Sequence, residues 1–134
     1  MLAQLHPAES AKMIAIVDDD PAVRNSLKFA LEVEGFGVRV YPGAQAMLDD
    51  GKLADVSCFV VDQNMPNITG LELVARLRQR AVFAPVILIT SQPSAVLRLR
   101  ASDVGVPIVE KPLLGNALVD RIRLAVGPEA RPQA

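Results

Sequence analysis

Short apolar runs rich in β-branched residues alternate along the chain with longer amphipathic stretches. The runs lie at residues 13–17, 38–41, 56–61, 86–90 and 106–109. Apolar and polar side chains do not alternate within them, which is typical of strands buried on both faces of a parallel sheet. The pattern therefore predicts five strands in one sheet.

Helices are expected between the runs and after the last, at residues 21–35, 44–48, 70–80, 94–102 and 114–126. Asp20 and Pro21 favour a helix start, as N-cap and first helical residue, and Gly35 favours an end. The stretch 94–102 contains "LRLR", which alternates like a strand. We interpret it as a helix because parallel neighbours need a crossover connection. The predicted apolar faces comprise Val23, Leu27, Ala30 and Leu31; Leu73, Val74 and Leu77; and Leu118, Ile122 and Ala125.

A β–α unit repeated five times predicts an α/β fold with a doubly wound parallel sheet and right-handed crossovers. The domain is expected at residues 13–126, after an N-terminal extension at 1–12 and before a flexible tail at 127–134. The sequence shows no repeat and no sign of a second domain, so no output domain is expected.

Composition and charge limit the classes of function that the protein can have. The 134 residues are 51% hydrophobic with a net charge of −1, which favours one domain with a real core and no direct nucleic-acid binding. The single cysteine, Cys58, lies in an apolar run and is expected in the core. No signal peptide and no run of about 20 apolar residues is apparent, so a cytoplasmic protein without membrane association is expected.

Polar side chains follow four of the five predicted strands, and in a parallel sheet the carboxyl ends of strands share one edge. They are Asp18, Asp19 and Asp20; Asp62; Thr90 and Ser91; and Glu110 and Lys111. Converging carboxylates repel one another, and a hard dication such as Mg²⁺ relieves the repulsion. A carboxylate can also attack a phosphoryl group and give an aspartyl phosphate, with metal and lysine neutralising the developing charge.

Four motifs, "VDDDP", "VVDQNMPNITG", "LITS" and "EKP", occur in this order. With this spacing the sequence resembles a response-regulator receiver domain, the phospho-acceptor module of two-component signalling, over residues 13–126. The "EKP" motif and the "TS" pair resemble those of receivers of the FixJ type, which normally precede a DNA-binding output domain. The resemblance implies a flavodoxin- and CheY-like sheet of order 2-1-3-4-5.

The resemblance also implies roles for individual residues. Asp62 is the phospho-acceptor and a metal ligand, and Mg²⁺ is further held by Asp18, Asp19 and the backbone carbonyl of Asn64. Thr90 is the switch hydroxyl, Lys111 contacts the phosphoryl group, Ser91 affects access, and Pro112 follows a cis peptide bond. Asp20 remains the helix cap.

Ile108 departs from the family pattern, because an aromatic residue often stands three places before the lysine. The usual aromatic–threonine coupling cannot operate through an isoleucine. Arginines 98, 100, 121 and 123 are expected to form a solvated face, and His6 is given no role.

The function implied is that of a stand-alone receiver and not an enzyme. Asp62 takes a phosphoryl group from a histidine kinase or phosphotransfer protein, and altered contacts then reach an unidentified downstream protein; a homodimer is left open. One alternative is a phosphorylation-independent interaction module, or a remnant of a DNA-binding regulator, motivated by Ile108. Another is a Mg²⁺-dependent phosphohydrolase of the haloacid-dehalogenase type, motivated by Asp18-x-Asp20, although its downstream acidic pair is missing.

Overall fold

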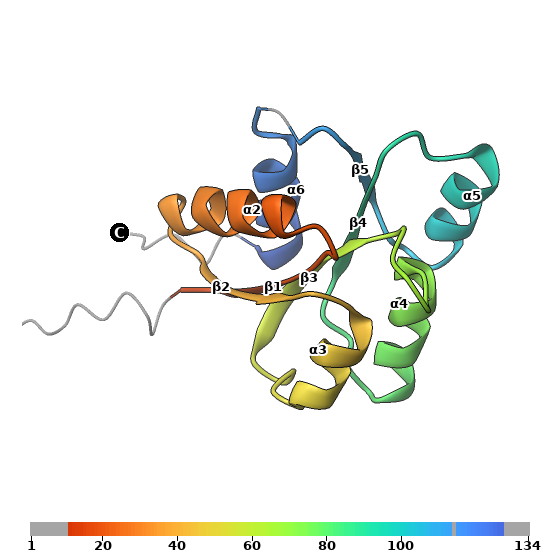
Figure 1. Cartoon of the computed structure of the whole chain (residues 1–134), viewed down its shortest axis with the longest axis horizontal. Coiled ribbons are helices and arrows are strands. Elements are labelled where there is room, and N and C mark those ends of the chain that lie inside the picture. The colour runs from red at the N-terminus through yellow and green to blue at the C-terminus, as the bar shows by residue number, and fades with distance from the viewer. Residues whose placement is uncertain (1–10, 114, 128–134) are drawn as a thin grey trace, which may run out of the picture.

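The computed structural model describes residues 11–113 and 115–127, which form one parallel sheet between two layers of helices (Figure 1). The strands are β1 (Met13–Val17), β2 (Gly37–Tyr41), β3 (Val56–Asp62), β4 (Val86–Thr90) and β5 (Ile108–Glu110). The helices are α2 (Pro21–Val33), α3 (Ala44–Asp50), α4 (Gly70–Gln79), α5 (Ala95–Asp103) and α6 (Ala117–Val126). The strand order is β2-β1-β3-β4-β5, so both the fold class and the predicted order are confirmed.

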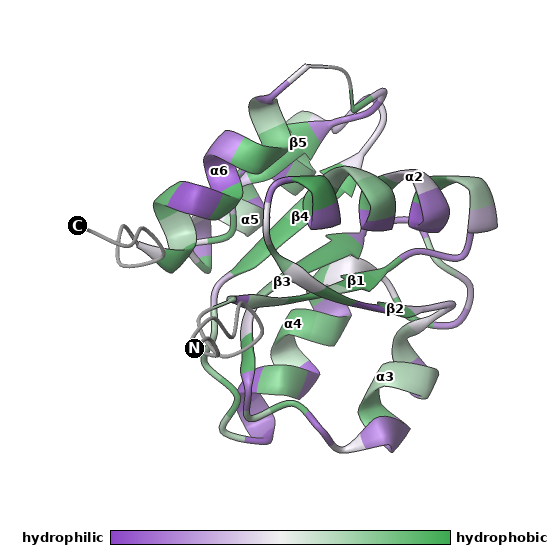
Figure 2. Ribbon diagram, turned by 90° about the vertical axis from the view of Figure 1, so that its left-hand side faces the viewer, coloured by the Kyte–Doolittle hydropathy of each residue, from purple (hydrophilic) through white to green (hydrophobic). Residues whose placement is uncertain are grey.

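The three central strands are almost wholly buried because helices cover both faces of the sheet. Ile14 and Ile16 of β1 point to the face covered by α2 and α6, while Ala15 and Val17 point to the face covered by α3, α4 and α5. Figure 2 shows these hydrophobic strands between helices that carry hydrophilic residues outside. The edge strands β2 and β5 are only partly buried, since each has one neighbour.

The helix predicted from "LRLR" is present as α5, but of its nine residues only Ala101 is buried. Ala30 does not belong to the buried face of α2, which is centred on Leu27 and Leu31; Ala30 is exposed. The other predicted faces lie against the core, with Leu73, Val74 and Leu77 of α4 and Leu118 and Ile122 of α6 buried and Ala125 partly buried.

Most predicted boundaries lie within two residues of the observed ones, and the largest shifts of a start are in the last strand and the last helix. The fifth strand was expected at 106–109, but the N–H of Val106 donates to the carbonyl of Ala101 and closes α5, and Pro107 has no N–H to give to a ladder. The strand therefore begins at Ile108. The last helix begins at Ala117, after Gly115 at φ 70°, and residue 114, where it was expected to begin, lies outside the described residues.

Residues 1–10 and 128–134 lie outside the described residues, so most of the predicted extension, with His6, and most of the predicted tail are not described. Within residues 11–113 and 115–127, no helix has the length and apolar character needed to cross a membrane.

Candidate functional site

The acidic site lies where two of the three central strands, β1 and β3, end. Val17 of β1 pairs with Val61 of β3, so Asp18 and Asp62 leave the sheet side by side. Asp18 is fully buried and Asp62 is 4% exposed, whereas Asp19 is exposed. One carboxylate oxygen from each of the three aspartates lies within 4.8 Å of the others. The predicted convergence of Asp18, Asp19 and Asp62 is thus present in the fold.

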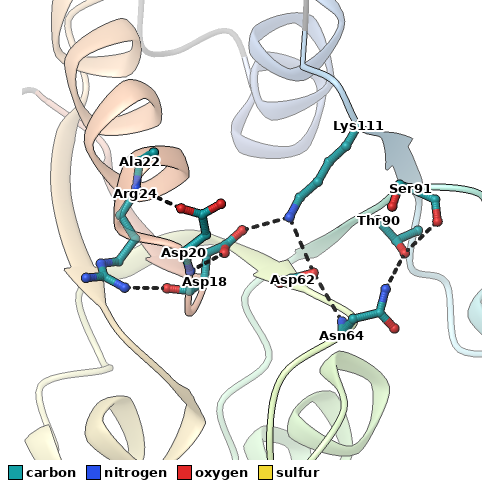
Figure 3. A network of polar contacts seen from close by, with 9 residues as sticks. All are labelled: Asp18, Asp20, Ala22, Arg24, Asp62, Asn64, Thr90, Ser91 and Lys111. Atoms are coloured by element: carbon teal, nitrogen blue, oxygen red, sulfur yellow. Dashed lines mark hydrogen bonds and ion pairs between the residues drawn. The ribbon is translucent and has the colours of Figure 1, made fainter.

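The loop from β1 into α2 is fixed by its own polar groups (Figure 3). The N–H of Asp20 donates to Asp18 Oδ1 at 2.9 Å, and Asp20 Oδ1 accepts from the N–H of Ala22 at 2.9 Å. Asp20 is therefore the helix cap, as predicted. Arg24 in the first turn of α2 reaches back and donates to the carbonyl of Asp18 at 2.8 Å.

We did not anticipate Arg24 from the sequence. The available signal was a cation one turn after three acidic residues, a spacing that lets its side chain return over the helix start. Its guanidinium orients the backbone that carries Asp18 and places a positive charge beside the acidic loop.

Lys111 reaches the acidic pair from the end of β5. Its Nζ lies 3.1 Å from Asp18 Oδ2 and 3.6 Å from Asp62 Oδ1. Burial lowers the pKa of Lys111, but the hydrogen bond to Asp18 and the charges of Asp18 and Asp62 outweigh this effect, so the pKa is raised overall. Lys111 is thus held as a cation, and the peptide bond that follows it, to Pro112, has the cis form that the resemblance implies.

Asp62 lies in an environment that opposes its charge. Burial raises the pKa of its carboxyl group, and the charges of Asp18 and Asp19 raise it further. The N–H of Asn64, which donates to Asp62 Oδ1 at 3.1 Å, and the charge of Lys111 act in the opposite direction without cancelling the rise.

The donor set fits a hard dication. Three carboxylates face one lysine, so negative charge remains uncompensated among the side chains of the cluster. Mg²⁺ takes oxygen ligands from one or two carboxylates together with water and phosphate oxygens. The arrangement can therefore accept Mg²⁺ next to Asp62 and leave ligand positions for a phosphoryl group.

The loop after Asp62 is tied to the start of α4. The N–H of Gly70 donates to the carbonyl of Gln63 at 3.1 Å, and Gln63 Oε1 accepts from the N–H of Leu71 at 2.9 Å. A Cβ on Gly70 would lie 2.6 Å from Leu88 Cδ2 and 2.9 Å from the carbonyl oxygen of Asp62. Only glycine lets the helix approach this closely, so Gly70 fixes the distance between α4 and the acidic site.

The hydroxyl end of the site lies on β4. Thr90 is 2% exposed; its Oγ1 accepts a hydrogen bond from Asn64 Nδ2 at 3.1 Å and donates to the carbonyl of Ser91 at 3.4 Å. Ser91 is exposed. Asn64, Thr90 and Ser91 line an open cleft of about 580 Å³ between α4 and α5. The sequence did not reveal the contact between Asn64 and Thr90, which are 26 residues apart.

The remaining candidates lie away from the carboxylates. Ile108 is partly buried against the core on the α3–α5 side of the sheet. Cys58 is fully buried, and burial raises the pKa of its thiol to about 12, as suits a core residue. The four arginines expected on a solvated face are exposed, but Arg98 pairs with Glu110, and Arg123 pairs with Glu34 at 2.9 Å and lies over the ring of Phe36.

Comparison with known proteins agrees with this geometry. The family model for the response regulator receiver domain matches residues 14–123. The transcriptional regulatory protein FixJ of Azorhizobium caulinodans is 37% identical over 118 residues, covering 87% of this chain and 56% of the relative. FixJ of Bradyrhizobium diazoefficiens is 35% identical over 122 residues, which cover 90% of this chain and 59% of the relative. The chain thus spans less than two thirds of the length of these relatives.

Solved structures show the same arrangement of elements. The crystal structure of FixJ-N superposes with a TM-score of 0.76 at 31% identity, covering 86% of this chain and 93% of that one. The Vibrio cholerae chemotaxis protein CheY4 superposes with a TM-score of 0.79 at 23% identity, covering 86% and 98%, and supports the fold alone.

Proposed function

Because the chain belongs to the response regulator receiver domain family, we propose that Asp62 is its phosphoryl-accepting residue. The observation that carries the proposal is the position of Asp62. Its carboxylate is buried at the end of a central strand, beside two other carboxylates and 3.6 Å from the ammonium of Lys111. Histidine kinases or phosphotransfer proteins are the proposed donors.

The chemistry follows from the contacts of Asp62. Oδ1 accepts the hydrogen bond from Asn64 and faces Lys111, whereas Oδ2 accepts none from the described residues. Oδ2 attacks phosphorus, the bond from phosphorus to the donor's imidazole nitrogen breaks, and that nitrogen keeps the electron pair. The ammonium of Lys111 then lies close enough to attract a phosphoryl oxygen.

Asp18, Asp19, Asp62 and the backbone carbonyl of Asn64 are the proposed ligands of Mg²⁺. When bound, the ion supplies positive charge next to the transferring oxygens. Thr90 is the proposed hydroxyl partner of the phosphoryl group, and Ser91 at the mouth of the cleft is proposed to govern access to it. The proposed receiver unit is residues 13–126.

Phosphorylation adds about −1.5 to −2 charges at this edge and biases the contacts the domain makes with a downstream protein. The proposed chemistry is limited to the domain's own phosphorylation and dephosphorylation. Ile108, in place of an aromatic residue, favours a second candidate in which partners bind independently of phosphorylation.

The test is intact-mass measurement after incubation with acetyl phosphate, with Mg²⁺ or with EDTA. The wild type is expected to gain a single phosphoryl adduct only with Mg²⁺, and Asp62→Asn is expected to gain none. Asp120→Asn, the same change at an exposed position on α6, is the matched control and keeps the adduct. A folded wild type without an adduct would favour phosphorylation-independent binding, and turnover of a generic aryl phosphate would indicate a phosphohydrolase.

A further inference from the structure

We propose that the side-chain amide of Asn64 is a latch that holds the Thr90 hydroxyl away from Asp62 until Asp62 is phosphorylated. The inference rests on the proposed function. It gives the side chain of Asn64 a positioning role, in addition to the proposed role of its backbone carbonyl as a metal ligand. Asn64 follows β3 and Thr90 ends β4, so the latch joins two neighbouring strands at the active edge.

The hydroxyl of Thr90 both accepts a hydrogen bond from and donates one to residues that line the cleft. Oγ1 accepts from Asn64 Nδ2 at 3.1 Å and donates to the carbonyl of Ser91 at 3.4 Å. Figure 3 shows the two bonds leaving Oγ1 in different directions, one toward Asn64 and one toward Ser91. In this arrangement the single O–H of Thr90 is directed to Ser91 and not to the site where a phosphoryl group would sit.

The same residue contacts the acceptor carboxylate through its backbone. The N–H of Asn64 donates to Asp62 Oδ1 at 3.1 Å while its side chain donates to Thr90. Asn64 is therefore a bridge of one residue between the acceptor and the hydroxyl. A change in charge or bonding at Asp62 acts on the Asn64 backbone, and thereby on the amide that holds Thr90.

Engagement of a phosphoryl oxygen by Thr90 requires its O–H to leave the carbonyl of Ser91. The Asn64 amide donates to Oγ1 in the observed orientation and so stabilises it relative to the engaged one. One neutral hydrogen bond has a net value equivalent to about a twofold to tenfold change in an equilibrium constant. Loss of the amide is expected to favour the engaged orientation by that factor.

The structure argues against a purely supporting role for this amide. Asn64 is exposed, so its side chain contributes little to the core. Asn64, Thr90 and Ser91 all line the open cleft, so water can replace the amide at Thr90 when it is removed. The stability of the fold is therefore expected to change little in Asn64→Ala.

The test is a double-mutant cycle with beryllofluoride, a phosphoryl analogue, as the probe. Its dissociation constant is measured by calorimetry at saturating Mg²⁺ for the wild type, Asn64→Ala, Thr90→Ala and the double variant. We expect Asn64→Ala to bind about twofold to tenfold more tightly than the wild type. In the Thr90→Ala background the same substitution is expected to have no effect, because there is no hydroxyl to release.

Asn25→Ala on the exposed face of α2 is the matched control, with binding as in the wild type. Unchanged or weaker binding in Asn64→Ala overturns the latch, and so does an equal change in both Thr90 backgrounds. If the wild type gains its adduct at Asp62 in these cases, the proposed function stands without the latch. If the wild type gains no adduct and binds no beryllofluoride, both proposals fail together.

Discussion

Asp62 shows what a single buried carboxylate does to the stability of the domain. Burial and the charges of Asp18 and Asp19 raise its pKa, and Lys111 offsets only part of this effect. A carboxyl group whose pKa is higher in the folded protein than in the unfolded chain destabilises the fold increasingly as the pH rises above the unfolded value, and fully above the folded one. Without a bound metal ion, the acceptor site is therefore a source of instability at neutral pH.

We predict that Asp62→Asn makes the metal-free protein more stable at pH 7, because the neutral amide removes a buried charge whose pKa is raised. The gain should shrink as the pH falls through the raised pKa and vanish below the ordinary value of 3.8, where Asp62 is protonated in both states. Urea unfolding in EDTA across this pH range measures it. Asp120→Asn should show no such trend, and an Asp62→Asn variant that is less stable than the wild type at pH 7 would contradict the prediction.

Among the elements, α4 has the best-defined start. Thr69 Oγ1 accepts from the N–H of Glu72 at 3.2 Å, and Glu72 Oε1 accepts from the N–H of Thr69 at 2.7 Å, which is a complete capping box. Gly70 and Gln63 tie the same turn to the strand that carries Asp62. The helix start and the acceptor loop therefore form one unit.

Thr69→Ala is expected to lower the free energy of unfolding by about 1 kcal/mol, because the hydroxyl half of the box is lost. Ser94→Ala is the comparison: Ser94 caps α5 with one bond to the N–H of Leu97 at 3.0 Å. It should have a smaller effect on global unfolding, since α5 is weakly anchored. Urea unfolding of both variants measures the two changes in the free energy of unfolding. A larger change in Ser94→Ala would show that α5 is more firmly docked than its burial indicates.

The elements also show which parts of the structure could be predicted from the sequence. The strands were predictable because burial on both faces leaves an uninterrupted apolar run, and Asp20 because a cap acts within its own turn. Strand order came from the family resemblance. The bonds from Arg24 to the backbone of Asp18 and from Asn64 to Thr90 were not predictable, because they depend on loop paths that periodicity does not encode.

Across the whole molecule, burial is unevenly distributed. The central strands are almost entirely buried and α4 buries four residues, whereas α5 buries Ala101 alone and exposes Val96 and Leu99. Local opening is easiest where few apolar contacts hold an element. The weakly held helix lies beside the cleft that Thr90 lines, so the part of the domain nearest the switch hydroxyl is also the easiest to rearrange.

Hydrogen exchange followed by mass spectrometry should therefore show α5 as the least protected of α4, α5 and α6, and β1, β3 and β4 as the most protected. Helix α4 serves as the internal control because it lines the same cleft but is firmly packed. Protection of α5 equal to that of α4 would mean that apolar burial does not control opening in this domain.

The shortness of β5 has a consequence for behaviour at high concentration. This edge strand has three residues, stands between Pro107 and Pro112, and carries the charged Glu110. A free strand edge can template the backbone of another molecule, and short length, proline and charge each hinder this. The other edge, β2, carries Arg39 at its centre, paired with Asp55. Both margins of the sheet are thus protected against strand addition and the aggregation that follows from it.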